Sequence, residues 1–242
     1  MKNGRALAQQ LVDSLSKEFG SRLECAVLYG SVARDEAIDG VSDVNVMLLL
    51  DDLHAATLGQ AAPAAQRWAR AGHTPPLIME REQWARAADV FAIELADMRD
   101  AHIVLHGQDC VGTGPIPLAD LRIQAERELR GKLLQLQTGM LMSDGDPKQL
   151  GELLKEALPS FATYLRAVIR LARQTVPTSM VQVIRQGMQV VGGTPDALLT
   201  VWEARVHKQG LRLTLRDPLV ENYHAAAEQT ADYVDNLREV GE

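Results

Sequence analysis

The chain opens with an amphipathic pattern. Apolar residues recur every fourth position over residues 6–19, and a glycine follows, which predicts a helix that ends before Gly20. The apolar stripe of this helix consists of Leu7, Leu11, Leu15 and Phe19.

Short, continuous apolar runs follow, and such runs are typical of buried strands. They predict strands over residues 23–29, 44–50, 77–79 and 103–105. An alanine-rich stretch over 55–71 lies between the second and third runs and predicts a helix that Pro63 breaks early. Alternating strands and helices indicate an α/β domain with a mixed sheet.

The pattern changes after residue 110. Residues 111–118 contain two glycines and two prolines and predict a linker between an α/β domain at 1–110 and a helical domain at 119–242. A first helix is expected over 121–141. Three later helices are expected after a capping residue and a proline, at Asp146-Pro147, Thr194-Pro195 and Asp217-Pro218. The C-terminal half is therefore predicted to be an all-α helical bundle.

Composition narrows the functional classes. The formal net charge of −7 argues against a broad nucleic-acid-binding surface, so nucleic acid is not an expected partner. The two cysteines, Cys25 and Cys110, lie far apart, which argues against a disulfide framework or a zinc site and predicts an inert core thiol at Cys25. With no secretory signal and no apolar run long enough to cross a membrane, we expect no membrane partner and a reducing, cytoplasmic location.

The strongest chemical signal lies between residues 28 and 50. Gly30-Ser31 ends the first predicted strand in a turn, where backbone N–H groups and a hydroxyl suit phosphate oxygens. Glycine also lets a ligand approach the backbone closely. Arg34 follows in the same turn and is interpreted either as a phosphate ligand or as a solvated arginine.

A second polar element begins the next predicted strand at Ser42-Asp43-Val44-Asn45. In an extended chain, positions 43 and 45 point to the same face, about 6.6 Å apart. An acid beside a buried strand costs free energy unless it has a partner, so a metal-binding role for Asp43 is favoured over a turn acid stabilised by Ser42. Asn45 is interpreted either as a ligand or as a structural hydrogen-bonding residue.

Together, Gly30-Ser31 and Ser42-Asp43-Val44-Asn45 resemble the polymerase-beta-type nucleotidyltransferase superfamily, in particular its small bacterial aminoglycoside and minimal nucleotidyltransferases. The resemblance implies Mg²⁺ as cofactor, a nucleoside triphosphate as substrate or ligand, and catalytic roles for Asp43 and Asn45. In that family both positions are normally Asp, and a third carboxylate comes from a later strand. Here position 45 is an amide, and the predicted strand over 77–79 contains no acid. Glu80 is the nearest candidate for the third ligand, and Glu94 is a more distant one.

Three functions remain open. The first is transfer of a nucleoside monophosphate to a hydroxyl on a small molecule or a protein. The second is a nucleotide-binding or regulatory module that has lost catalysis, because two carboxylates are missing and Mg²⁺ favours carboxylate ligands. The third is a protein-interaction scaffold that binds no nucleotide. An oligomer is compatible with each of them.

Overall fold

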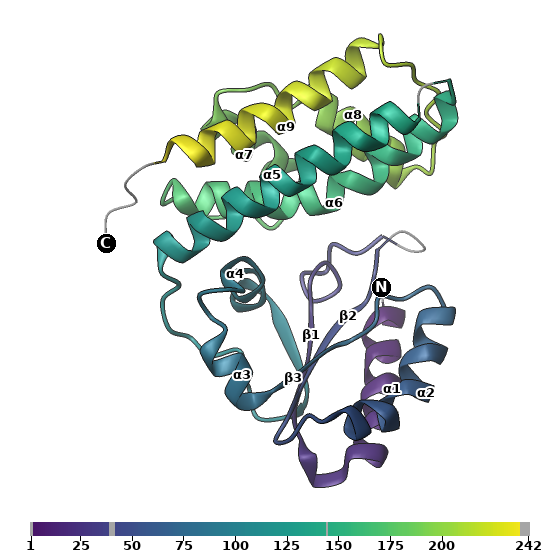
Figure 1. Cartoon of the computed structure of the whole chain (residues 1–242), viewed down its shortest axis with the longest axis vertical. Coiled ribbons are helices and arrows are strands. Elements are labelled where there is room, and N and C mark those ends of the chain that lie inside the picture. Colours follow the sequence, from purple (N-terminus) through teal and green to yellow (C-terminus); the bar gives the residue numbers. More distant parts are fainter. Residues whose placement is uncertain (1, 39–41, 144, 238–242) are drawn as a thin grey trace. The chain divides into compact units, whose positions relative to one another are not determined.

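The computed structural model describes residues 2–38, 42–143 and 145–237 (Figure 1). Residues 39–41, which belong to the segment that carries the motif, lie outside the described residues. The chain divides into two compact units, Met1–Ile116 and Pro117–Glu242. The predicted boundaries at 1–110 and 119–242, with 111–118 as a linker, stay predictions.

A four-stranded mixed sheet forms the centre of the first unit. Its strands are β1 (Leu23–Tyr29), β2 (Asn45–Leu50), β3 (Leu77–Glu80) and β4 (His102–Gly107). They are arranged in the order β3-β2-β1-β4. β1 pairs antiparallel with both β2 and β4, whereas β2 and β3 run parallel. All four predicted strands are therefore confirmed, and so is the mixed sheet.

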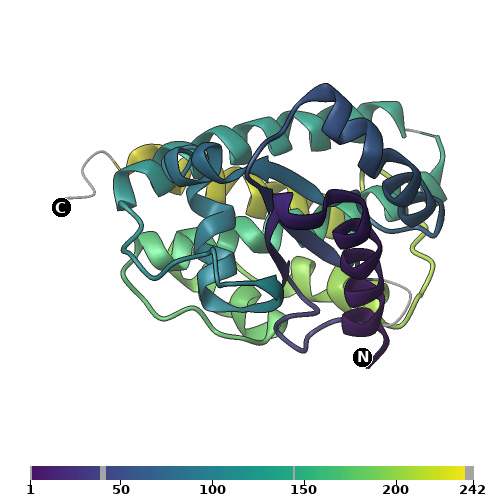
Figure 2. The same ribbon diagram turned by 90° about the horizontal axis from the view of Figure 1, so that it is seen from below.

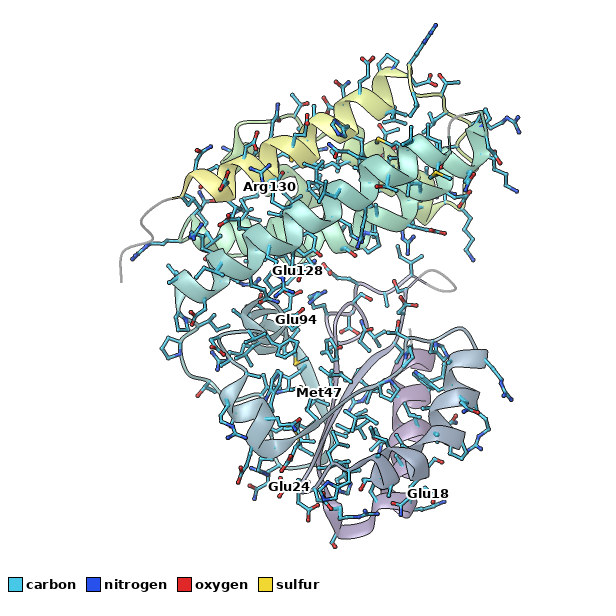
Figure 3. All side chains as sticks on the ribbon, in the orientation of Figure 1. Glu18, Glu24, Met47, Glu94, Glu128 and Arg130 are labelled. Carbon is cyan, nitrogen blue, oxygen red and sulfur yellow. A yellow bond between two sulfur atoms is a disulfide. The ribbon has the colours of Figure 1, made fainter. Side chains whose placement is uncertain are left out.

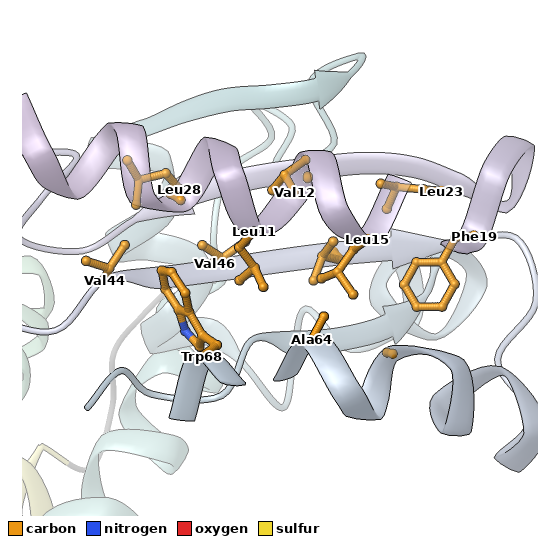
Figure 4. Packing of buried hydrophobic residues seen from close by; sticks show 14 of the residues in the cluster. Leu11, Val12, Leu15, Phe19, Leu23, Leu28, Val44, Val46, Ala64 and Trp68 are labelled. Atoms are coloured by element: carbon orange, nitrogen blue, oxygen red, sulfur yellow. The ribbon is translucent and has the colours of Figure 1, made fainter. Parts of the chain in front are cut away.

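Two helices cover one face of this sheet, α1 (Lys2–Phe19) and α2 (Ala55–Arg70), and they pack against each other (Figures 1 and 2). The short 3₁₀ helix η1 (Gly20–Arg22) links α1 to β1. The predicted apolar stripe of α1 packs into this core, where Leu11, Leu15 and Phe19 lie between the sheet and α2 (Figure 4). Because this stripe is buried, its residues are apolar at helical spacing, and the helix could be predicted from the sequence.

Pro63 does not break α2, and the prediction that it would was wrong. The helix is continuous through Pro63, which is exposed. The proline removes one backbone hydrogen bond on the solvent side. Ala61, Ala64 and Trp68 are buried, and their packing holds the two halves of the helix in line.

The opposite face of the sheet is covered by α3 (Arg81–Arg86) and α4 (Ala92–Asp100). Trp84 from α3 and Leu95 and Met98 from α4 pack against Val27 and Met47 of the sheet. The sequence did not predict these helices. α3 is short, and α4 is buried nearly all round, so neither shows the amphipathic period that marks a surface helix.

The two cysteines form a disulfide between Cys25 of β1 and Cys110, which follows β4. The expectation of an inert core thiol was therefore wrong, and so was the argument against a disulfide. The physical reason is sheet pairing, because Cys25 lies opposite Gly107 on the neighbouring strand. That pairing returns the chain to β1 after a sequence separation of 85 residues, which spacing alone did not reveal.

The second unit is helical, as predicted. It contains α5 (Leu118–Met142), α6 (Pro147–Leu171), α7 (Met180–Val191), α8 (Asp196–Val206) and α9 (Pro218–Asn236). α6 is the most buried of them and packs against each of the other four. Among the described residues, no helix is both long enough and apolar enough to cross a membrane.

The three predicted starts are correct in position, but only one is capped as expected. The Asp146 carboxylate accepts hydrogen bonds from the backbone N–H groups of Lys148 and Gln149. Thr194 does not cap α8, whose N-cap is Pro195 and which has no side-chain cap. Asp217 accepts hydrogen bonds from Thr214 instead of from α9, and these bonds lower the pKa of its carboxyl.

Replacing Asp146 with alanine is expected to lower the free energy of unfolding of the helical unit by about 1 kcal/mol, because two backbone donors lose their acceptor. Urea unfolding followed by circular dichroism measures the change. Lys148→Ala is the matched control, because its exposed side chain lies beside the cap and takes no part in it. Equal destabilisation by both substitutions would contradict the capping role.

Candidate functional site

The turn that follows β1 has a fixed and unusual backbone. Gly30 adopts a positive φ of 78° immediately after the strand ends. The N–H of Arg34 donates to the carbonyl of Gly30 at 3.2 Å, and the N–H of Glu36 donates to the carbonyl of Ser31 at 2.9 Å. Val32 is buried in the core beneath α1 and α2 and anchors the turn to the sheet.

This turn presents a row of hydrogen-bond donors. In the described part of the chain, no group accepts a hydrogen bond from the backbone N–H groups of Ser31, Val32 and Ala33 or from the Ser31 hydroxyl. Successive N–H groups at the start of a tight turn carry partial positive charge and bind anions. The arrangement suits the oxygens of a phosphate group.

Asn45 lies beside the same turn. Residue 45 pairs with Tyr29 across the first two strands, one position before Gly30. Val44 and Val46 belong to the core under α1 and α2, so Asn45 faces the other side of the sheet. A Cβ atom placed on Gly30 would lie 2.7 Å from Nδ2 of Asn45, which shows how closely the amide approaches the turn. The structure thus brings Gly30, Ser31 and Asn45 together.

Asp43 is exposed and precedes β2 by two residues. In the part of the chain that the structure describes, no hydrogen bond joins it to the neighbouring Ser42. Ser42 accepts a hydrogen bond from the N–H of Ile38 through its hydroxyl, and its own N–H donates to the Ile38 carbonyl, each at 2.9 Å. Among the described residues, the Asp43 carboxylate therefore lacks the hydrogen bond from Ser42 that the turn-acid alternative required.

Arg34 is not the solvated arginine that the sequence left open. Its side chain is only 10% exposed and forms ion pairs with Glu36 at 3.3 Å and with Asp97 of α4 at 3.8 Å. Two carboxylates already balance its charge, so Arg34 joins the turn to α4. Its role as a phosphate ligand stays a prediction. Sequence reasoning missed Asp97; an acid within the apolar stretch FAIELAD was the signal that it needed a partner.

Substituting Arg34 with methionine is expected to lower the free energy of unfolding by about 2–3 kcal/mol, because the largely buried carboxylates of Glu36 and Asp97 each lose an ion-pair partner. Thermal or urea unfolding measures the loss. Arg81→Met is the matched control, since the ion pair of Arg81 with Glu24 is largely exposed and is expected to contribute less than about 1 kcal/mol. If Arg34→Met proved no more destabilising than Arg81→Met, the ion cluster would not hold the turn.

The structure does not bring Glu80 to this site. Glu80 pairs with Leu50, and Leu77 pairs with Met47, because β3 runs parallel to β2. Glu80 therefore lies five positions along the sheet from Asn45, about 16 Å away at the rise of a strand. Its proposed role as a metal ligand is dropped, and the part of β3 nearest to Asn45 carries no acid.

Another carboxylate comes closer from the covering helix. Glu94 lies in the first turn of α4 (Figure 3). The pKa of Tyr29 is raised mainly by burial and further by the charge of Glu94. Tyr29 is the register partner of Asn45. Glu94, the more distant candidate from the sequence, is therefore close enough to act on the strand position that pairs with Asn45, and its role as a ligand stays a prediction.

The donor set does not fit a resident pair of Mg²⁺ ions. Within the described ranges, no three His, Cys, Asp or Glu side chains lie close enough together to hold a metal ion. Of the two predicted ligands, Asp43 supplies one carboxylate, whereas Asn45 supplies a neutral amide that turns its nitrogen toward Gly30. Magnesium keeps several waters and is usually bound through one or two carboxylates together with substrate phosphates, so a resident pair of ions needs more carboxylates than Asp43 and the Asn45 amide supply.

The two histidines of β4 have structural partners. Nδ1 of His102 lies 2.8 Å from the carbonyl of Met98, and Nε2 lies 3.1 Å from Asp109. Nε2 of His106 lies 3.2 Å from the carbonyl of Leu23. These contacts fasten β4 to α4, to the segment after the strand and to β1. They give both histidines a structural role.

Comparison with known proteins identifies a shared fold. No protein-family model matches the chain, and a search of curated proteins finds no match. Among solved structures, the chain is similar to spectinomycin adenyltransferase AAD(9) from Enterococcus faecialis, determined with ATP and spectinomycin. The TM-score is 0.60 at 10% sequence identity, over 94% of this chain and 98% of that one. The chain therefore shares the nucleotidyltransferase fold, a mixed sheet with helices followed by a helical part.

Proposed function

We propose that the chain is a nucleotidyltransferase-like protein that binds a nucleoside triphosphate at the turn beginning with Gly30-Ser31. The observation that carries the proposal is the row of N–H donors on Ser31, Val32 and Ala33, which have no acceptor among the described residues and follow a glycine against which the Asn45 amide packs. The shared fold supports it, because the similar adenyltransferase was determined with ATP.

The reaction proposed for this site is transfer of a nucleoside monophosphate to a hydroxyl on a small molecule. The acceptor oxygen forms a bond to the α-phosphorus, the bond from that phosphorus to the β-phosphate oxygen breaks, and pyrophosphate leaves. The hydroxyl proton passes to solvent. The donors of the turn hold the phosphates and offset the charge that develops on them. The spectinomycin named with the similar adenyltransferase supports a small-molecule acceptor.

A second candidate is nucleotide binding without transfer. Asn45 and the absence of an acidic cluster among the described residues favour it, since phosphoryl transfer by two metal ions needs several carboxylates. Both candidates use the same turn and differ only in whether pyrophosphate is released.

Incubation with ATP labelled at the α-phosphate, in Mg²⁺ or Mn²⁺ and with a panel of hydroxyl compounds that includes aminocyclitols, separates the two. Labelled product with pyrophosphate release supports transfer. ATP binding without release supports the second candidate. Absence of binding by ATP, GTP, CTP and UTP would contradict both and leave the scaffold role.

Ser31→Ala serves as the test variant in these assays, because it removes one open donor from the turn. Ser21→Ala is its matched control, an exposed serine in η1 of the same unit. Only the former is expected to weaken nucleotide binding.

A further inference from the structure

We propose that Asn45 binds phosphate directly as a hydrogen-bond donor, so that the nucleotide is held without a divalent metal ion. This inference rests on the proposed function and gives the chemistry of the same site. It assigns to Asn45 a role different from the metal ligand that its position in the motif suggests.

The first step is the orientation of the Asn45 side chain. From the Cβ position of Gly30, the distances are 2.7 Å to Nδ2, 3.7 Å to Cγ and 3.8 Å to Cβ of Asn45. The NH₂ group is therefore the part of the side chain nearest the turn. It lies beside Gly30, which directly precedes Ser31, Val32 and Ala33, and it adds a donor from the neighbouring strand to this end of the turn.

The second step is the chemistry of an amide in place of a carboxylate. A carboxylate only accepts hydrogen bonds, so it meets a phosphate oxygen through a bridging cation. The NH₂ group of asparagine donates two hydrogen bonds and carries no charge, so it contacts a phosphate oxygen directly and without repulsion. Hydrogen bonds to charged acceptors are about twice as strong as neutral ones.

The third step is the lack of competing ligands for a metal. Glu80 lies at the far end of the sheet, and the carboxylates of Glu36 and Asp97 form ion pairs with Arg34. Asp43 and Glu94 are the remaining candidate carboxylates, and they belong to no group of three or more metal-ligating side chains in the described ranges. So few carboxylates hold a resident Mg²⁺ ion weakly, whereas the donors of the turn and Asn45 act together on one anion.

The test is isothermal titration of the whole chain with ATP, once in EDTA and once in excess Mg²⁺. We expect the wild-type chain to bind ATP in EDTA, with an affinity within about threefold of that in Mg²⁺. Asn45→Ala is expected to weaken binding in EDTA by about tenfold or more through loss of a charge-assisted hydrogen bond. Asn45→Asp has nearly the same shape; it should bind still more weakly in EDTA and recover when Mg²⁺ is added.

Each result bears on a different claim. Wild-type binding only in Mg²⁺, or equal binding of wild type and Asn45→Asp in EDTA, would overturn the inference while leaving nucleotide binding intact. No binding of wild type in either buffer would overturn the proposed function itself. Thermal unfolding of each variant shows whether it is folded, and Asn45→Ala keeps the test decisive if Asn45→Asp is unstable.

Discussion

Replacing Gly30 with alanine is expected to lower the affinity for ATP by about a hundredfold or more, because the site loses both its shape and one donor. Alanine disfavours the positive φ of 78°, at a cost of about 1–3 kcal/mol. Its methyl group would also lie 2.7 Å from Nδ2 of Asn45 and displace the amide from the turn. Isothermal titration with ATP measures the effect.

The chain offers a matched control for this substitution at Gly72. That glycine has a φ of 87°, yet a Cβ atom placed there meets nothing within 4 Å. Gly72→Ala is therefore expected to lower stability by a similar backbone strain and to leave ATP affinity unchanged. If Gly30→Ala bound ATP as tightly as Gly72→Ala, the close approach of Asn45 to the turn would have no part in binding.

Reducing the Cys25–Cys110 disulfide is expected to lower the free energy of unfolding of the first unit by about 4 kcal/mol, within the usual range of 2–5 kcal/mol. The bond joins residues that are 85 positions apart, and closing so long a loop removes much conformational freedom from the unfolded chain. Urea unfolding with and without dithiothreitol measures the difference. Cys110→Ser should reproduce the reduced midpoint and show no further response to dithiothreitol.

Identical unfolding midpoints in oxidising and reducing buffer would contradict a stabilising disulfide.

The disulfide also bears on the predicted cellular location. The cytoplasmic prediction rested partly on cysteines that were expected to be unpaired, and that premise was wrong. Disulfides persist mainly in oxidising compartments. The cytoplasmic location therefore stays a prediction, and the cysteines no longer argue for it.

Local pattern was sufficient for much of the fold. The four strands were legible because each is a short apolar run that is buried or half-buried in the sheet, and α1 because one stripe is apolar and the opposite side is not. α4 was missed because burial on nearly all sides removes that contrast. The predicted break at Pro63 was wrong because the free-energy cost of a proline in a helix depends on whether it lies on the solvent side. The sequence alone does not show which side of this helix faces solvent.

The candidate site could be predicted only in part, because some of its contacts join segments that are distant in the sequence. Gly30, Ser31 and Asn45 come from neighbouring ends of two paired strands, so the motif predicted their proximity. The parallel pairing of β3 with β2 places Glu80 far from Asn45. Pairing between distant segments produces both the Arg34–Asp97 contact and the disulfide. These contacts depend on how distant segments meet, which residue spacing does not encode.

The central claim is that a nucleotide phosphate is held by the turn that begins with Gly30-Ser31. Titration of ¹⁵N-labelled protein with ATP, followed through the backbone amide resonances, tests it most directly. We predict saturable shifts at Ser31, Val32 and Ala33, the three residues whose N–H groups are open in the described structure, together with the side-chain NH₂ resonances of Asn45. Saturable shifts confined to other residues, or no shifts at all, would contradict the claim.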